Sequence, residues 1–411
     1  MEASPKDTPS IFLNRKLRRK LAREFIRRFC SGFSGGILLF AGVRIVTALL
    51  RNPFRESLPK IWQGILSEEC ARVATFFGLY PSLYHLLVDV LSVWRKNDGW
   101  NFGISGGLAG LSVAILDKTK RQTLAFFTLS RALGAGLSTL VARGVITAIP
   151  FFEVMVFCLC TSIIVYCVAL RPQYLNTGYY RSILKWSRDY TDKNLQIMFR
   201  VPGTRYITCD EGGLHEGSCV QHRLKDLLKS LPGFAKLYLP IHVTPIVIFK
   251  RKVVAERPLY VLKSLVKNMI LSTTFLGLTV ALAKITICVL RNGLHQPPPL
   301  AGFIPALGGF VCGIALLLER HSRRKELSLF VIPHTINILY IAIKRSKLGP
   351  GLRIPHGFTL LFALSMMSVM HAYEREPESL SLLINGLLKF FVGPRTRPVT
   401  KPLSQNNNIV S

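Results

Sequence analysis

Four residues near the middle of the chain have side chains that bind zinc in many proteins. Cys209, His215, Cys219 and His222 follow one another with the spacing C-x5-H-x3-C-x2-H. Thiolate sulfur and imidazole nitrogen are the usual ligands of structural zinc, although this spacing matches no common zinc finger closely. The set is a candidate metal site, and the alternative is that these are ordinary loop residues. We expect no other cofactor.

Ionisable residues lie within or beside long apolar segments, namely Arg44, Asp89, Arg131, Glu153, Lys284 and His334. In a membrane such groups usually face the interior of a helix bundle or a wet cavity. Arg131 and His334 occupy matching places in two similar stretches, so together they would suit an anionic substrate or a lipid headgroup. The alternative is that each reaches the interface or pairs with a carboxylate such as Asp89 or Glu153.

Catalytic signatures are missing from the sequence. It contains no phosphate-binding loop, no G-x-S-x-G elbow and no H-E-x-x-H motif. Acid and base pairs that would share one helix face are missing too. We therefore expect a protein that is not an enzyme.

The elements that must position these residues are membrane helices. Hydrophobic residues make up 49% of the chain and the mean hydropathy is +0.34. The apolar residues fall in long blocks, several of them near the lower limit of about 17 residues for a span. The sequence therefore predicts an all-α, polytopic fold with about ten spans, at 30–50, 71–94, 101–116, 122–142, 151–170, 233–249, 264–290, 301–318, 326–343 and 356–373.

Two stretches about 200 residues apart have the same order of features, which indicates an internal duplication. Gly106-Gly107 and Gly308-Gly309 each precede an acidic residue, a basic cluster and a second apolar block. Two tandem repeats of five helices are predicted, and an odd number of spans would insert them in opposite senses, as in inverted-repeat transporters. The predicted divisions are a basic amphipathic segment at 1–29, a first repeat at 30–190, a polar central loop at 191–231, a second repeat at 232–393 and a disordered tail at 394–411.

The N-terminal segment reads as a basic amphipathic helix. Apolar residues recur every fourth position, with arginine and lysine between them: Leu13, Leu17, Leu21, Phe25 and Phe29. Such a helix can lie on a membrane surface. It is interpreted as a cytosolic anchor for the first span, and a mitochondrial presequence is the alternative.

The charge of the chain favours an anionic membrane surface as its partner. The formal net charge is +31 and the pI is about 10.2. Because the basic residues are scattered between apolar blocks and form no single face, we expect lipid headgroups, and no nucleic acid, to bind them. A second copy of the chain or another membrane protein is the other expected kind of partner.

The nine cysteines do not form a disulfide framework. Five lie inside apolar blocks, where cysteine behaves as a small hydrophobic residue: Cys158, Cys160, Cys167, Cys288 and Cys312. This usage fits an organelle membrane that faces a reducing cytosol.

Small residues recur every fourth position in two apolar blocks. The glycines concerned are Gly103, Gly106, Gly107, Gly110, Gly309 and Gly313. Such faces let helices approach closely in lipid, so we expect helix packing here. A face that lines a conduit is the alternative.

Several of these motifs resemble those of the transmembrane protein 135 family. They are the run Ser105 to Ser112, the pair Lys120-Arg121, the Ile-Pro before a span and Leu170-Arg171-Pro172-x-Tyr174 after it. The resemblance covers roughly residues 36–393, and the central segment is most similar to fungal-type members. The small-residue helices also resemble the wider superfamily of mitochondrial inner-membrane translocase subunits and a small peroxisomal membrane protein. The chain departs from the animal members in having two central cysteines where those have a cysteine-rich run.

This resemblance implies a multi-pass protein of peroxisomes or mitochondria that acts in organelle dynamics and lipid homeostasis. A non-enzymatic protein of that kind is the leading hypothesis. One alternative is an inverted-repeat carrier or channel for an anionic metabolite or fatty acid, with Arg131 and His334 at its site. Another is a component of protein import, which the superfamily likeness alone suggests.

Overall fold

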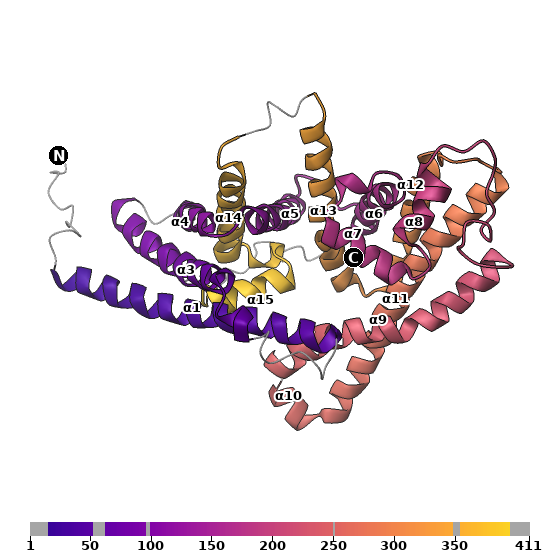
Figure 1. Ribbon diagram of the computed structural model, residues 1–411. Coiled ribbons are helices and arrows are strands. Elements are labelled where there is room, and N and C mark those ends of the chain that lie inside the picture. The colour runs from indigo at the N-terminus through magenta and orange to yellow at the C-terminus, as the bar shows by residue number, and fades with distance from the viewer. Residues whose placement is uncertain (1–14, 52–61, 96–98, 250, 348–353, 395–411) are drawn as a thin grey trace, which may run out of the picture. The chain divides into compact units, whose positions relative to one another are not determined.

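The computed structural model describes residues 15–51, 62–95, 99–249, 251–347 and 354–394, and within these ranges it is helical without any strand (Figure 1). The prediction of an all-α protein is therefore confirmed. The predicted tail after residue 394 and the beginning of the N-terminal segment lie outside the described residues.

The chain divides into two compact units. Unit 1 combines residues 1–148 with 354–411, and its helices are α1 (Arg15–Arg51), α3 (Glu68–Trp94), α4 (Trp100–Gly110), η1 (Leu111–Ile115), α5 (Lys118–Ala142), α14 (Gly357–Arg375), η6 (Pro377–Ser379) and α15 (Leu382–Phe391). Unit 2 is residues 149–353, with α6 (Phe152–Leu170), η2 (Pro172–Tyr174), α7 (Thr177–Ser187), α8 (Asp192–Leu195), η3 (Gln196–Arg200), α9 (Cys219–Phe249), α10 (Arg251–Glu256), α11 (Pro258–Gly293), α12 (Phe303–Gly313), η4 (Ile314–Leu318) and α13 (His321–Arg345).

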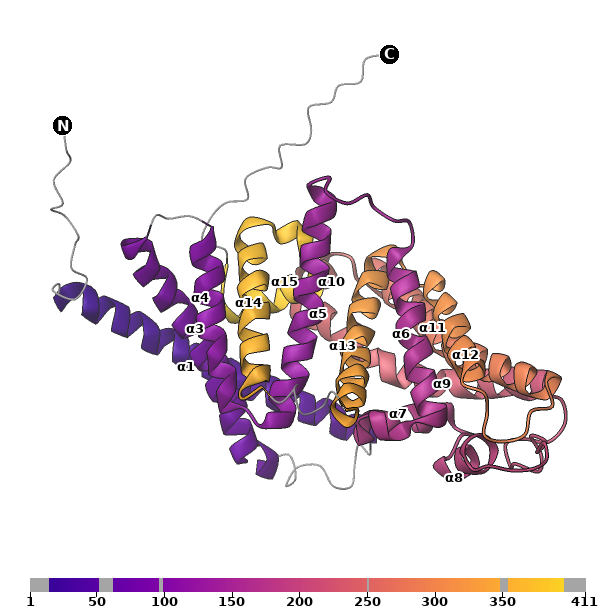
Figure 2. The ribbon, with the colours of Figure 1, turned by 90° about the horizontal axis from the view of Figure 1, so that it is seen from above.

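In unit 1, α14 from the end of the chain packs against α4 and α5, and α1 lies along α3 (Figures 1 and 2). The core of the unit includes the buried residues Tyr84, Phe102, Met370 and Tyr373. Glycines make the contact with α14 close: a Cβ on Gly106 would lie 2.6 Å from the Cβ of Met370. Gly103, Gly107 and Gly110 also face α14.

Unit 2 is built in a similar way around α6. This helix packs against α12 and α13, while α9 lies along α11 (Figure 2). A Cβ on Gly309 would lie 2.4 Å from the carbonyl oxygen of Thr161, and one on Gly313 would lie 2.6 Å from the Cα of Cys158. The absence of side chains at these glycines lets the α12 and α6 backbones come together, which is how helices associate in lipid.

The basic cluster that follows each glycine-rich helix has a local structural role. Arg121 donates to the carbonyl oxygens of Ala114 and Leu116 at 2.8 and 2.9 Å, at the end of η1. Arg324 donates to those of Leu317 and Glu319 at 2.7 and 2.9 Å, at the end of η4. The last carbonyls of a helix have no partner within it, so these arginines satisfy them.

The structure confirms fewer spans than the ten predicted. Among the described residues, five helices are long and apolar enough to cross a membrane: α3, α5, α6, α11 and α13. The predicted span at 30–50 is part of the continuous helix α1, which begins at Arg15 and carries many basic residues. The predicted spans at 101–116 and 301–318 each change from α-helix to a short 3-10 segment.

The predicted domain boundaries follow the order of the chain, whereas the compact units do not. The fifth helix of each predicted repeat packs in the other unit: α6 belongs to unit 2 and α14 to unit 1. The predicted domain boundaries therefore remain a prediction about the sequence repeat, and they differ from the boundaries of the two compact units.

The close contact at Gly309 predicts a clear effect of one added methyl group. Gly309→Ala should lower the free energy of unfolding in detergent by about 1–3 kcal/mol, because a Cβ would overlap the α6 backbone. Gly136→Ala on α5 is the control, since nothing lies within 4 Å of a Cβ there. It should change stability by less than about 1 kcal/mol, in the stabilising direction. Equal effects of the two substitutions would contradict the packing role of Gly309.

Candidate metal centre

Three cysteines and one histidine meet in unit 2. Cys209, His215, Cys219 and Cys288 each offer one ligand atom, and these four atoms all lie within 4.8 Å of one another. The Sγ atoms of Cys209 and Cys219 are 3.8 Å apart, and all the cysteines of the protein are free. The group has the donor types of a closed, four-coordinate zinc site.

Three different segments position the four residues. Cys209 and His215 lie at the two ends of a tight turn, in which the backbone N–H of Leu214 donates to the carbonyl of Cys209 at 2.9 Å. Gly213 gives this turn its positive φ of 66°, a conformation that glycine adopts at little cost. Cys219 is the first residue of α9, and Cys288 lies near the end of α11.

The structure replaces one of the predicted ligands. His222 is one turn into α9, where its ring stacks on that of His215 with 4.6 Å between centroids. Its Nε2 lies 3.3 Å from a carboxylate oxygen of Asp189, away from the cysteine sulfurs. The fourth member of the group is Cys288, which the sequence had suggested to be only a small apolar residue.

Polar groups on the end of α11 surround the sulfurs. The Nη2 of Arg291 donates to the Sγ of Cys209 at 3.2 Å, and the Nδ2 of Asn292 donates to the Sγ of Cys219 at 3.3 Å. The Oδ1 of Asn292 accepts from the hydroxyl of Tyr206 at 2.6 Å and from Arg291 at 3.3 Å. Because arginine can only donate, the amide oxygen must face it, which directs the amide N–H groups toward the sulfurs.

The surroundings also favour the thiolate form of one cysteine. The pKa of Cys209 lies well below its usual value, because its sulfur accepts a hydrogen bond from the Cys288 thiol and faces the Arg291 guanidinium; these effects outweigh its burial. Thiolate is the form of cysteine that ligates metals.

A buried network of charges lies next to the cysteine group. The Nζ of Lys284 is 2.9 Å from a carboxylate oxygen of Asp226 and 3.4 Å from one of Asp189, and it also donates to the carbonyl of Ser187. Asp189 in turn pairs with Arg223, whose side chain is fully buried. One predicted member of the conduit site, Lys284, is thus an ion-pair partner that fixes α11 to the segment after α7 and to the start of α9.

The other predicted site residues lie in separate environments. Arg131 and His334 follow the first residues of α5 and α13 at the same distance along the chain, but Arg131 belongs to unit 1 and His334 to unit 2. Arg131 is buried with its guanidinium 4.7 Å from the Phe127 ring centroid. His334 stacks on Tyr179 with centroids 3.9 Å apart. Glu153 lies 3.5 Å from the Nε2 of His321.

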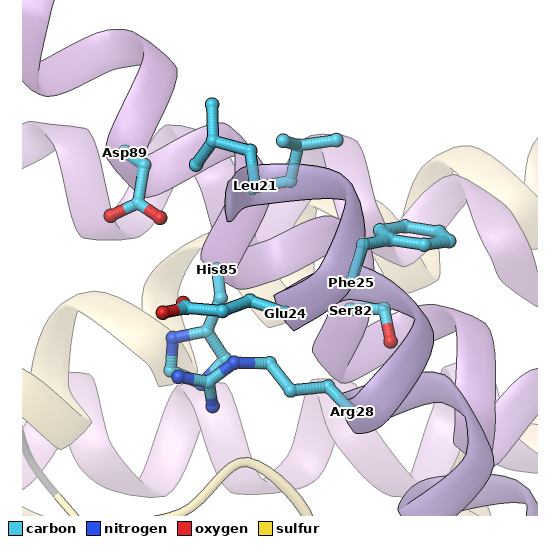
Figure 3. Close-up of a pocket in the computed structure, with 8 residues that line it drawn as sticks. Leu21, Glu24, Phe25, Arg28, Ser82, His85 and Asp89 are labelled. Carbon is cyan, nitrogen blue, oxygen red and sulfur yellow. The ribbon is translucent and has the colours of Figure 1, made fainter. Parts of the chain in front are cut away.

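Asp89 borders a small cavity between α1 and α3 in unit 1 (Figure 3). Glu24 and Arg28 from α1 converge there on His85 from α3. The cavity measures about 10 Å³, which is room for roughly one water molecule. It is too small for a metabolite or a fatty acid.

A local pattern in the sequence places Cys288 on a polar helix face. Lys284, Cys288 and Arg291 recur at intervals of four and three residues, so they share one face of a helix. A polar stripe on an otherwise apolar span marks a buried site. The pattern indicates the polar face, but it does not indicate the loop that covers it.

The buried network predicts that Asp189 is important for stability. Asp189→Asn should lower the free energy of unfolding by roughly 3 kcal/mol, because it leaves the buried Arg223 without its carboxylate. Asp192→Asn is the matched control: Asp192 is half-exposed where it pairs with Arg200, so its loss should cost less than about 1 kcal/mol. Chemical unfolding of both variants in detergent measures the difference, and similar losses would contradict the role of Asp189.

The stability difference between the wild type and Asp189→Asn should depend on pH. Burial alone would raise the pKa of Asp189, but Lys284 and Arg223 outweigh it and hold the pKa below its usual value. The stabilisation is therefore complete above the unfolded pKa of about 3.9 and is lost as the pH falls through the lower folded value. The stability gap between the wild type and Asp189→Asn should shrink below about pH 4.

One comparison with known proteins finds a family match. Residues 208–343 match the model of the N-terminal cysteine-rich region of Transmembrane protein 135, and all four members of the cysteine and histidine group lie within them. Neither a curated protein nor a solved structure matches the chain. The wider likeness to translocase subunits remains a prediction. Over residues 208–343 the chain matches the transmembrane protein 135 family, the same family that the motifs of the first repeat resemble.

Proposed function

We propose that this chain is a non-enzymatic, multi-pass membrane protein of peroxisomes or mitochondria that acts in organelle dynamics and lipid homeostasis. The family match and five helices of spanning length support the membrane part of the proposal. The organelle and the lipid role rest on what the family resemblance implies.

The observation that carries the proposal is the large amount of apolar side chain exposed along the spanning helices. Leu133 on α5 is 59% exposed, Leu159 on α6 is 52% exposed and Ile270 on α11 is 60% exposed. A soluble protein buries large apolar side chains in such numbers or covers them with a partner. Hydrocarbon chains of a bilayer would cover them here, which supports lipid as the main partner of the chain.

We also infer that the two units derive from one duplicated five-helix element. Both contain a glycine-rich helix that passes into a short 3-10 segment, η1 or η4, and is capped by an arginine. The residues before α6 and α14, Phe151 and His356, have the same φ of 56°. On this basis the proposal keeps the count of about ten spans.

Two short helices fit the membrane interface. α7 and α15 each follow a three-residue 3-10 segment, η2 or η6, after the fifth helix of a predicted repeat. α15 exposes the apolar residues Leu382 and Phe390, and α7 has Trp186 beside Lys185. Aromatic and basic side chains favour the headgroup region. These helices would hold the protein at the level of the lipid headgroups.

The carrier alternative has less support. Arg131 and His334 have aromatic neighbours within their own units, and the cavity beside Asp89 has room for about one water molecule only. Fatty-acid flux into liposomes that is lost in Arg131→Ala would replace our proposal with that of a carrier.

The localisation can be tested with the tagged full-length protein. It should stay in the membrane after alkaline carbonate extraction and should comigrate with a peroxisomal or mitochondrial marker. Cells that lack the chain should show an altered lipid composition in that organelle, which the wild-type gene restores. Protein found only in the endoplasmic reticulum or the plasma membrane would remove the basis of the proposal.

The five-helix repeat predicts a topology. Protease cleavage sites placed before Arg15 and between Val201 and Ile207 should report opposite sides of the membrane, because five spans separate them. In intact organelles only one of the two sites should be cut, and both should be cut after the membrane is permeabilised. Cleavage of both sites, or of neither, in intact organelles would rule out an odd number of spans.

A further inference from the structure

We propose that Cys209, His215, Cys219 and Cys288 bind one zinc ion, which joins the turn from Cys209 to His215 to the start of α9 and the end of α11. This inference does not depend on the proposed function, because it rests only on residues of unit 2. The ion would be structural, since four protein ligands leave no open coordination position for a substrate.

The spacing of the sulfurs fits a metal ion. With Zn–S bonds of about 2.3 Å, neighbouring sulfurs of a tetrahedral site lie about 3.8 Å apart. The Sγ atoms of Cys209 and Cys219 are 3.8 Å apart, and the remaining ligand atoms are within 4.8 Å. A disulfide would require the sulfurs to be about 2.0 Å apart.

His215 has a buried nitrogen that needs a partner. Its side chain is nearly buried, and its Nε2 makes no hydrogen bond within the described part of the chain. An unsatisfied buried polar atom costs about 1–3 kcal/mol. Its Nδ1 lies 3.4 Å from the carbonyl oxygen of Glu216. Metal-binding histidines commonly donate their second N–H to a carbonyl, which leaves the lone pair of the other nitrogen free for the metal.

The groups around the sulfurs are those that an outer shell requires. Arg291 and Asn292 donate to the sulfurs of Cys209 and Cys219, so these sulfurs act as acceptors. The hydroxyl of Tyr206 donates a hydrogen bond to the Oδ1 of Asn292 and so holds the amide in the required orientation. Outer-shell hydrogen bonds of this kind orient ligands and tune affinity.

The charge of Arg291 supports the same conclusion. Its side chain is 2% exposed, and among the described residues it forms no ion pair with a carboxylate. A buried guanidinium needs a negative partner. Three thiolates with one divalent cation carry a single net negative charge, which would balance that of Arg291.

The ligand types select zinc over calcium and magnesium. Calcium and magnesium prefer oxygen ligands, and the group contains none. Three thiolates and an imidazole are a common set for structural zinc.

Metal analysis of the full-length protein, purified in detergent under reducing conditions, tests the proposal. We expect about one zinc per chain in the wild type and almost none in Cys288→Ser or His215→Ala. Cys312→Ser is the matched control, because Cys312 is equally buried and lies outside the group. His222→Gln should also keep the metal. Wild-type protein without zinc, or Cys288→Ser protein with a full complement, would overturn the proposal.

A second measurement needs no substitution and so avoids variants that fail to fold. Cys209, Cys219 and Cys288 should resist maleimide in the wild type and become labelled after a zinc chelator is added. The exposed Cys30 should react in both conditions. Identical labelling with and without chelator, or a Cys209–Cys219 disulfide in the purified protein, would contradict a zinc site.

The outer shell provides a graded test. Asn292→Leu should weaken zinc binding about 10- to 100-fold, as other outer-shell substitutions do. Competition with a chelator of known affinity measures this change. Unchanged affinity would show that the sulfurs do not depend on Asn292 and would count against the proposed coordination.

Discussion

Close contact between helix backbones is the constraint on which the rest of the structure depends. In a membrane the lipid is as apolar as the side chains, so packing and hydrogen bonding must hold helices together. The glycines of α4 and α12 allow this packing by leaving room for the α14 and α6 backbones. Through these contacts each glycine-rich helix binds a helix from a distant part of the sequence, and so each unit acquires its core.

The end of α11 shows how a spanning helix can carry a polar face. Lys284, Cys288 and Arg291 lie on one side of it, within three turns of its last residue. Each has a polar partner from outside the helix: two aspartates for Lys284, and the turn from Cys209 to His215 for the other two. The cost of burying these groups is offset because all of them meet partners at the same place. The apolar remainder of the helix is free to face lipid.

The sequence was most informative where local patterns decide the structure. The helical class, the five helices of spanning length and apolarity, and the glycine-rich faces follow from hydropathy and from spacing within one helix. Three of the four members of the cysteine and histidine group were predicted. Cys209, His215 and Cys219 are near neighbours in the sequence, but Cys288 comes from a different helix and was concealed by its apolar surroundings. His222 has the right side-chain chemistry, yet its Nε2 lies beside Asp189. The sequence did not predict which helix packs on each glycine face, because each pair of helices joins two different predicted repeats.

The placement of α14 has a consequence for synthesis of the protein. Unit 2 is a continuous stretch of chain and can assemble as soon as residue 353 has entered the membrane. Unit 1 cannot, because α4 and α5 must wait for the last helices to be translated before their partner exists. Throughout that interval the glycine face of α4 is open to lipid or to other nascent helices. An early stop codon would thus remove α14 and leave α4 and α5, which are made early, without their packing partner.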